Sequence, residues 1–541
     1  MTWPLARDVR SGVPNHDDAY FHMWRIAWVA HQLPRAPLQL FDANIFAPMR
    51  DTLALSDAAL LQSLIAAPAI WLGTRTILIY NLLLLGSMAA SAWCAYLLAM
   101  RLTGAPGPSL LAGFIFGFGP YKFAHFPHLE LQASMWMPLA FSAVHRLAFG
   151  PGESSGGGDK SAFRGAGVAL GAVLAMQALS ALYYFMFLAI ALAVMVAVLF
   201  AAIPAGDKRR LVSGLVVAAV VALAVVVPYS RPYSRVRQVV GTRSAGEVAQ
   251  FSGQVSDYAR GGLGRWEHKP DNSGEERVLS PGLLAPALAV VALWPPLDAW
   301  RVASAAVLAV AFDGSLGTNG YLFGAARGLV PALDGLRAAA RFAVVVLLVL
   351  AMLAAIGLAR LLRHRSGWTM GVATVVAIAA CTVDFWAAPV KLRYPVTRPT
   401  PLTVFLAALP PGTILLHLPV PKPAALWANE TTYQYWSTFH WQPLVNGYSA
   451  YSPTNYVRTL NVLRTFPDAE SIGRLRRLKV GYVVVHPPMF GRRDYVRIAS
   501  ALSESDDLEL VGRFSKPMES LVFRLKAEPT ARADRPVAPP G

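Results

Sequence analysis

The stretch FAVVVLLVLAMLAAIGLA, residues 342–359, decides the fold class, because none of its residues carries a charge. As a helix rising 1.5 Å per residue it is about 27 Å long, which is close to the thickness of the bilayer hydrocarbon. The stretch LVVAAVVALAVVV, residues 215–227, has the same character. We therefore predict a mainly α-helical protein that crosses a membrane.

The composition of the whole chain agrees with this prediction. Charged residues make up 15% of the 541 positions and apolar residues 55%, whereas soluble proteins carry about a quarter charged residues. Windows of about twenty residues predict a polytopic bundle of about ten spans. They are residues 76–100, 107–121, 128–148, 164–181, 184–204, 210–228, 281–299, 301–312, 340–362 and 369–388.

The short loops predict the orientation of the bundle, since cytoplasmic loops carry an excess of Lys and Arg. One set of alternate loops carries most of these residues, namely Arg101, Arg146, Lys160, Arg164, Lys208, Arg209, Arg210, Arg360, Arg363 and Arg365. We expect this set to be cytoplasmic. The sequence divides into a first loop with interfacial helices (1–75), the bundle (76–389) and a soluble domain (390–541). We expect the first loop, the bundle loops 229–280 and 313–339, and the soluble domain on the opposite, extracytoplasmic side.

The net charge of +17 does not indicate nucleic-acid binding. The basic residues flank predicted spans, where positive-inside bias and anionic lipid headgroups explain them. Cys94 and Cys381 lie in separate predicted spans, which predicts neither a disulfide nor a metal site for them.

The first polar cluster lies at Asn15–Trp24 and contains adjacent acids, Asp17 and Asp18. A carboxylate at the edge of the bilayer can accept a proton from an acceptor hydroxyl while a lipid phosphate departs. Asp57 is a second acid that, with Asp18, would hold a divalent cation such as Mg or Mn if one is used. The alternative is that Asp17 and Asp18 cap the amino end of an interfacial helix.

The second polar cluster contains His125, His128 and Glu130, at the turn between two predicted spans. These side chains suit contact with a polar substrate or a metal ion. A structural turn around Pro127 is the competing interpretation.

The third cluster is basic and consists of Arg337 and Arg341, spaced four residues apart where the chain re-enters the membrane. On one face of a helix, two guanidinium groups suit a phosphate. Interfacial arginines that extend toward the headgroups are the alternative.

After Arg393 the pattern changes to short apolar runs that predict strands, TILLHLPV, VGYVVVHP, LELVGRF and SLVFRL, with helices at 468–478 and 493–503. We expect a small α/β domain with a disordered tail. Its aromatic-rich segment offers Trp441, Asn446 and Tyr448 for binding an acceptor sugar, or else for packing.

Together these residues resemble the GT-C class of membrane glycosyltransferases, and within it the bacterial YfhO-type and RgtA/B/C/D-like set. Four stretches carry the resemblance: Asp18 six residues before Trp24, with WVAHQL and LFDANIFAP after it; AHFPHLELQASMWMPLAF; LDGLRAAARF; and HWQPLVNGYSAYSPTNY. Since the family has a span before the first outer loop, we expect one more span ahead of Thr2, eleven in all.

The resemblance implies an inverting, metal-optional transferase of the bacterial inner (plasma) membrane that uses a polyprenyl-phosphate-linked sugar. Asp18 matches the family's acidic residue as base, with Asp17 as second choice. Arg337 and Arg341 would hold the donor phosphate, and the His125, His128 and Glu130 cluster would position sugar or acceptor. The rival functions are a non-catalytic assembly or binding protein for cell-envelope glycans and a lipid or solute transporter.

Overall fold

The computed structural model of the protein describes residues 1–150, 160–259, 276–329, 335–422 and 429–527. They form two compact units. Unit 1 contains Met1–Ala30 and Asp57–Pro395, and unit 2 contains His31–Ser56 and Val396–Gly541. Residues 31–56, which we grouped with the first outer loop, thus belong with the carboxy-terminal residues. The predicted disordered tail lies outside the described residues.

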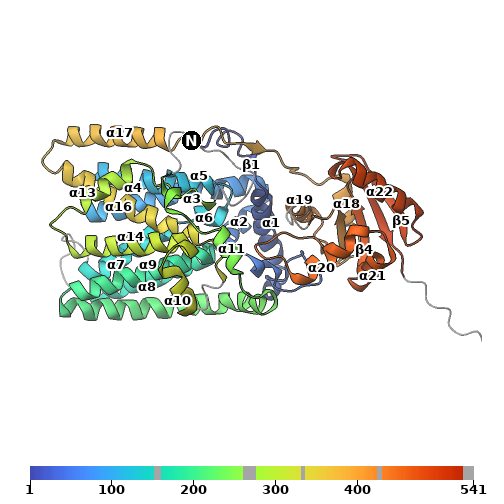
Figure 1. Cartoon of the computed structure of the whole chain (residues 1–541), viewed down its shortest axis with the longest axis horizontal. Helices are drawn as coiled ribbons and strands as arrows, with labels where there is room; N and C mark the ends of the chain where they lie inside the picture. The colour runs from blue at the N-terminus through green and yellow to red at the C-terminus, as the bar shows by residue number, and fades with distance from the viewer. Residues whose placement is uncertain (151–159, 260–275, 330–334, 423–428, 528–541) are drawn as a thin grey trace, which may run out of the picture. The chain divides into compact units, whose positions relative to one another are not determined.

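Unit 1 is a helical bundle with one small sheet, in which β1 (Val13–Pro14) pairs antiparallel with β2 (Leu392–Arg393). Figure 1 shows its long helices lying side by side. The α-helices of its described residues are α1 (Asp17–Gln32), α2 (Leu60–Trp71), α3 (Thr76–Thr103), α4 (Pro106–Phe118), α5 (Pro120–Ala124), α6 (Leu129–Gln132), α7 (Trp136–Phe149), α8 (Lys160–Ser180), α9 (Leu182–Ala202), α10 (Ala205–Val240), α11 (Ala245–Gln250), α13 (Leu284–Ala292), α14 (Ala299–Leu316), α15 (Leu322–Leu329), α16 (Ala343–Leu361) and α17 (Gly367–Asp384).

Helix α16, which contains most of the apolar run 342–359, lies in the centre of the bundle. It is buried over nearly its whole length and packs against α3, α4, α13 and α14. Gly357 permits the close approach of α13, since a Cβ atom there would meet the main-chain oxygen of Leu288. A helix that is apolar on every side is suited to such a position.

Within the described residues, six helical segments are long and apolar enough to cross a membrane: α3, α9, α10, Ala299–Asn319, Ala339–Leu361 and α17. On α10 and α17 apolar side chains such as Val216, Val220 and Val375 are exposed, as expected for helices that face lipid. The chain is therefore an integral multi-pass membrane protein, which confirms the predicted class.

Two of the other predicted spans contain shorter helices, because proline and glycine end them. Residues 107–121 contain α4, which has 13 residues and ends before Gly119 and Pro120. Residues 281–299 contain α13, which has 9 residues and ends before Pro295 and Pro296. In the other direction, α10 continues to Val240 through two prolines, well beyond the predicted end at residue 228.

Unit 2 contains the predicted small α/β domain. Its four-stranded sheet has the order β3-β4-β6-β5, with β3 parallel to β4 and the other two pairs antiparallel. The sheet buries Leu416, Val483 and Phe523 in a core shared with Leu475 and Leu502. The α-helices and strands of its described residues are α18 (Pro401–Ala407), β3 (Ile414–Leu418), α19 (Glu430–Trp436), α20 (Thr454–Val462), α21 (Ala469–Arg477), β4 (Val480–Val485), α22 (Arg492–Glu504), β5 (Leu508–Phe514) and β6 (Ser520–Leu525). All four predicted strands and both predicted helices are confirmed.

Candidate active site

One face of α1 carries three buried polar side chains. Asp18, His22 and Arg25 are spaced four and three residues apart, and residues at this spacing share a helix face. They are 7%, 1% and 1% exposed. The aromatic residues Phe21 and Trp24 of α1 are buried as well.

A folded segment between α4 and α7 places the second polar cluster opposite this face. The ammonium group of Lys122 is buried and donates to the carbonyls of Leu131 (3.0 Å) and Gln132 (3.3 Å) and to the hydroxyl of Ser134 (2.7 Å). The amide of Gln132 donates in return to the carbonyls of Lys122 (2.8 Å) and His125 (2.7 Å). These bonds fold residues 119–135 back on themselves, which fixes the positions of His125, His128 and Glu130.

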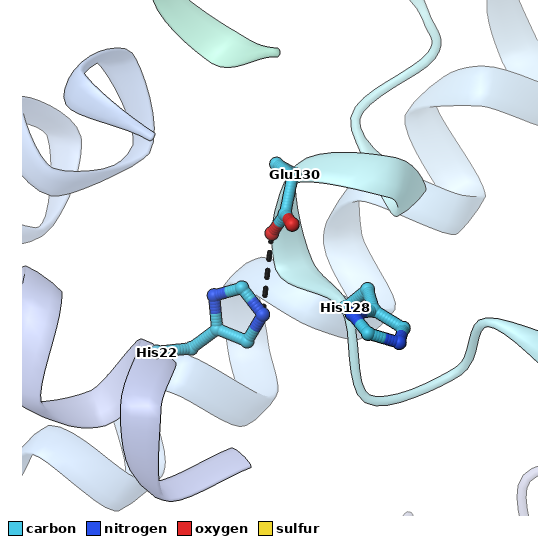
Figure 2. Close-up of side chains that lie close together, drawn as sticks. All are labelled: His22, His128 and Glu130. Atoms are coloured by element: carbon cyan, nitrogen blue, oxygen red, sulfur yellow. Dashed lines mark ion pairs between the residues drawn. The ribbon is translucent and has the colours of Figure 1, made fainter. Parts of the chain in front are cut away.

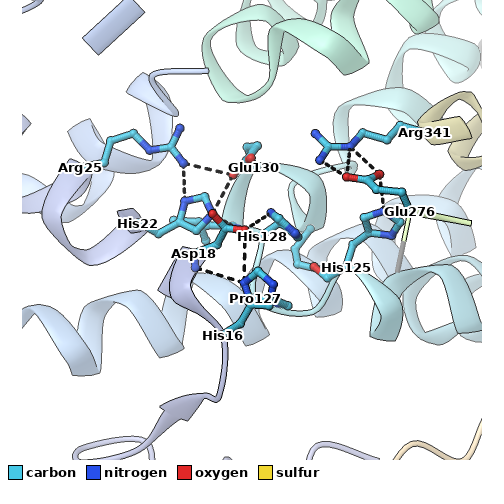
Figure 3. Close-up of polar contacts among 12 residues, drawn as sticks. His16, Asp18, His22, Arg25, His125, Pro127, His128, Glu130, Glu276 and Arg341 are labelled. Atoms are coloured by element: carbon cyan, nitrogen blue, oxygen red, sulfur yellow. Dashed lines mark hydrogen bonds and ion pairs between the residues drawn. The ribbon is translucent and has the colours of Figure 1, made fainter. Parts of the chain in front are cut away.

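Asp18 lies between two imidazoles. Its carboxylate oxygen Oδ2 is 3.2 Å from Nδ1 of His16 and 3.4 Å from Nδ1 of His128. Burial alone would raise the pKa of Asp18, but the contacts with His128 and His16 outweigh it and hold the pKa well below its usual range. Burial lowers the pKa of His128, and the nearby carboxylate of Asp18 opposes this shift. Asp18 is therefore an ionised carboxylate between the rings of His16 and His128 (Figure 3).

Next to it, Arg25, His22 and Glu130 form a buried cluster. Nη2 of Arg25 contacts Nδ1 of His22 and donates to Oε2 of Glu130 at 3.3 Å. Since a guanidinium group only donates, Nδ1 of His22 accepts, which leaves the ring proton on Nε2. Nε2 lies 3.2 Å from the same oxygen of Glu130, as Figure 2 shows.

A second set of charges consists of His125, Glu276 and Arg341. Nε of Arg341 donates to both oxygens of Glu276 (3.1 and 2.9 Å), and its Nη2 donates to Oε1. His125 has an acceptor at each ring nitrogen, the carbonyl of Tyr121 at Nδ1 and the carboxylate of Glu276 at Nε2, both at 3.0 Å. A doubly protonated ring satisfies both, so the set carries two positive charges and one negative charge.

Glu276 is ionised in this set. It is 4% exposed, and burial would raise its pKa. The charges of Arg341 and His125 outweigh burial and hold the pKa well below its usual range. The two sets lie side by side in Figure 3, with the rings of His125 and His128 6.0 Å apart.

His22, His128 and Glu130 could hold a metal ion, since one donor atom from each lies within 4.8 Å of the others. Two imidazoles and a carboxylate suit a transition metal such as zinc better than Mg. However, Arg25 already binds both His22 and Glu130, so a cation competes with its guanidinium group. Within the described residues, Asp18 and Asp57 belong to no such group.

Of the other two predicted acids of unit 1, Asp17 lies near the surface, whereas Asp57 is buried and close enough to the two sets to interact electrostatically with Glu130, Arg25 and Arg341. Asp17 pairs with Arg393 at 2.9 Å near the surface. Asp57 accepts a bond from the main-chain nitrogen of Leu182 at 3.0 Å, and burial raises its pKa to about 6.

Arg337 is partly exposed, and its guanidinium group lies 4.6 Å from the centre of the Phe251 ring. Arg337 and Arg341 do not share the helical turn that we expected. Only residues 339–342 form a 3₁₀ helix there, and α16 begins at Ala343.

In unit 2, the three predicted acceptor-binding residues have different environments. Asn446 is buried, and its amide bonds both main-chain groups of His417 and the carboxylate of Glu430. These bonds give it a structural role, because they use the whole amide. Trp441 stacks on His31 with ring centres 3.9 Å apart, and Tyr448 is partly exposed.

His22, Arg25 and Glu276 are site residues that were not predicted from the sequence. A helical projection from Asp18 finds the first two, at the fourth and seventh positions after it. Glu276 has no local signal, because its partner Arg341 is 65 residues away in sequence.

Comparisons with known proteins find no matching family model and no matching curated protein. Several solved structures are similar to this chain, and two of them follow. The archaeal oligosaccharyltransferase AglB from Archaeoglobus fulgidus, in complex with an inhibitory peptide and a dolichol-phosphate, has a TM-score of 0.50 at 14% identity, over 90% of this chain and 67% of that chain. ArnT from Cupriavidus metallidurans, in the apo state, has a TM-score of 0.52 at 14% identity, over 95% of this chain and 94% of that chain. At such identity the likeness shows the fold alone, and this chain has a GT-C-like fold.

Proposed function

We propose that this protein is a membrane glycosyltransferase, which moves a sugar from a polyprenyl-phosphate donor to an extracytoplasmic acceptor with inversion at the anomeric carbon. The observation that carries the proposal is the ionised carboxylate of Asp18 beside a buried, positively charged set of groups, in a chain with a GT-C-like fold. The similar AglB structure contains a dolichol-phosphate, which is a lipid phosphate of the proposed kind.

In this proposal Asp18 is the base. The acceptor hydroxyl oxygen attacks the anomeric carbon, the bond from that carbon to the phosphate oxygen breaks, and polyprenyl phosphate leaves with the electron pair. The hydroxyl proton moves to the carboxylate of Asp18, which is ionised and can therefore accept it. A single displacement of this kind inverts the configuration of the sugar. None of these steps uses a metal ion.

The donor phosphate is assigned to Arg341 and His125. With Glu276 they form a set with a net positive charge, and Glu276 orients both cations. Nη1 of Arg341 has no hydrogen-bond partner among the described residues and is free to donate to a phosphate oxygen. We also assign to the donor phosphate Arg337, a partly exposed residue four positions before Arg341, as a further positive charge.

The acceptor is assigned to the side of Asp18, with His128 beside it. In unit 2, Trp441 and Tyr448 keep their proposed role in binding the acceptor, because neither side chain is fully buried. On this proposal, unit 2 lies on the extracytoplasmic side of the inner membrane and serves the assembly of cell-envelope glycans.

The proposal is tested with membranes that contain the wild type, Asp18→Asn or Asp17→Asn, supplied with labelled polyprenyl-phosphate sugars. Loss of a catalytic base costs about 10²- to 10⁴-fold in rate. We expect such a loss for Asp18→Asn and less than a tenfold loss for Asp17→Asn, whose carboxylate pairs with Arg393 near the surface. Equal label transfer by the wild type and Asp18→Asn would refute the role of Asp18. If no label leaves the lipid in any membrane, a binding or transport function is favoured instead.

A further inference from the structure

Arg25 is buried and yet incompletely hydrogen-bonded. Its side chain is 1% exposed, and its Nε and Nη1 atoms have no hydrogen-bond partner within the described residues. Buried donors without partners are rare in proteins because they cost free energy. The open donors of Arg25 therefore indicate a bound group that completes them.

The charge around Arg25 indicates what kind of group this is. Glu130 already compensates the guanidinium charge at 3.3 Å, and the neighbouring His22 is neutral, since burial lowers its pKa. A phosphate would bring an uncompensated negative charge next to Glu130. The set of Arg341, Glu276 and His125, which has a net positive charge, suits a phosphate far better than this neutral pair does.

Arg25 and Glu130 offer hydrogen-bond donors and an acceptor side by side. Both contacts of Glu130 use its Oε2 atom, so Oε1 has no partner among the described residues. The face of the Arg25 guanidinium group lies 4.6 Å from the centre of the Phe21 ring, which leaves its edge for the ligand. Neutral hydroxyl groups match this arrangement, because each hydroxyl both donates and accepts a hydrogen bond.

The position of the pair fits the transferred sugar. Arg25 lies seven residues after Asp18 on the same face of α1, which is about 10 Å along the helix. This distance is roughly the size of one sugar ring with the bonds on either side of it. Figure 3 shows Arg25 and Glu130 pointing toward one another above Asp18, with Glu276 and Arg341 farther to the right.

We propose that Arg25 and Glu130 together bind neighbouring hydroxyl groups of the transferred sugar and so select a neutral, polyhydroxylated donor. This inference rests on the proposed glycosyl transfer. Arg25 and Arg341 thus have different ligands, since Arg341 binds the phosphate and Arg25 binds the sugar.

The first test compares donors that each lack one hydroxyl group, in the wild type and in the double variant Arg25→Met/Glu130→Gln. The double variant removes both buried charges together, and thermal unfolding of the purified full-length protein checks that it folds. The donor is the polyprenyl-phosphate hexose or pentose that supports the most transfer. In the wild type we expect one or two of the deoxy donors to lose about ten- to a hundredfold in kcat/KM, as for hydrogen bonds to charged groups. In the double variant the same donors should lose less than threefold. Equal losses in both proteins would overturn the inference.

The second test measures binding without transfer. The purified protein is heated with polyprenyl phosphate or with its hexosyl derivative, and the midpoint temperatures are compared. We expect the hexosyl lipid to stabilise the wild type more than the bare lipid does, and this extra stabilisation to disappear in the double variant. If the double variant also loses stabilisation by bare polyprenyl phosphate, Arg25 binds the phosphate and the inference is wrong. If the wild type binds both lipids equally, the inference fails even where transfer occurs. Absence of transfer by the wild type together with a sugar-dependent shift would refute only the proposed function.

Discussion

Two histidines of unit 2 should make that unit unstable in mild acid. His440 and His486 are buried, and burial lowers the pKa of each to about 3, against an ordinary value of about 6.5. As the pH falls below 6.5, these histidines therefore become protonated in the unfolded chain. In the folded unit they stay neutral down to about pH 3. The stabilisation from keeping them neutral is complete above pH 6.5 and falls as the pH falls toward 3. At 1.36 kcal/mol per pH unit, each histidine costs about 2 kcal/mol at pH 5.

The substitution His440→Asn isolates one of these contributions. Nδ1 of His440 accepts from the main-chain nitrogen of Gln442 at 3.1 Å, and an asparagine oxygen can take over this bond without titrating. We expect the loss of stability between pH 7 and pH 5 to be about 2 kcal/mol smaller in the variant than in the wild type. His364→Asn is the control, because His364 is exposed.

Amide hydrogen exchange of the buried strands β3 and β4, corrected for the intrinsic exchange rate at each pH, measures this difference. A difference of about 2 kcal/mol corresponds to about a 30-fold difference in exchange rate. If the wild type and His440→Asn lose protection equally between pH 7 and pH 5, the buried neutral histidine is not the cause and the argument is wrong.

Three further predictions concern unit 1. Lys122→Met leaves buried carbonyl and hydroxyl acceptors unpaired and should destabilise the protein by about 2 kcal/mol, which lowers the midpoint of thermal unfolding. An unchanged midpoint would contradict the role of Lys122 in folding residues 119–135. Arg341→Lys replaces the paired donors of the guanidinium group by a point charge. The KM for the lipid donor should rise about tenfold, while the KM for the acceptor stays within twofold. Equal changes in both KM values would contradict the assignment of the phosphate to Arg341. Treatment with a chelator should leave transfer within twofold, because Arg25 already binds His22 and Glu130; loss of transfer that zinc restores would show that a metal is required.

The sequence predicts the fold class well, because long apolar runs and short alternating runs are local signals. The run 342–359 becomes the buried centre of the bundle, and the four strand-like runs of unit 2 become β3 to β6. The number of spans is less predictable. A hydropathy average over about twenty residues does not detect helix-ending pairs such as Gly119-Pro120 and Pro295-Pro296. These pairs end α4 and α13 before either helix is long enough to span a membrane.

The site is predicted only in part, since its partners come from distant segments. Asp18, His128 and Glu130 stand out in the sequence as polar groups near apolar runs, and the structure brings them together. In the sequence, Arg25 resembles an isolated arginine at the membrane surface. Only the structure shows that its side chain is buried. The pairing of Arg341 with Glu276 depends on tertiary structure alone, and the expected helical pairing of Arg337 with Arg341 is wrong because the chain there is not α-helical.

The most direct test of the central claim uses a donor with two labels, tritium in the sugar and phosphorus-32 in the phosphate, with the purified wild-type protein in lipid vesicles. Glycosyl transfer predicts that tritium moves to the acceptor while phosphorus-32 stays on the polyprenyl lipid, in equal molar amounts. Movement of both labels together, or retention of both on the intact donor in the presence of acceptor, would contradict the claim.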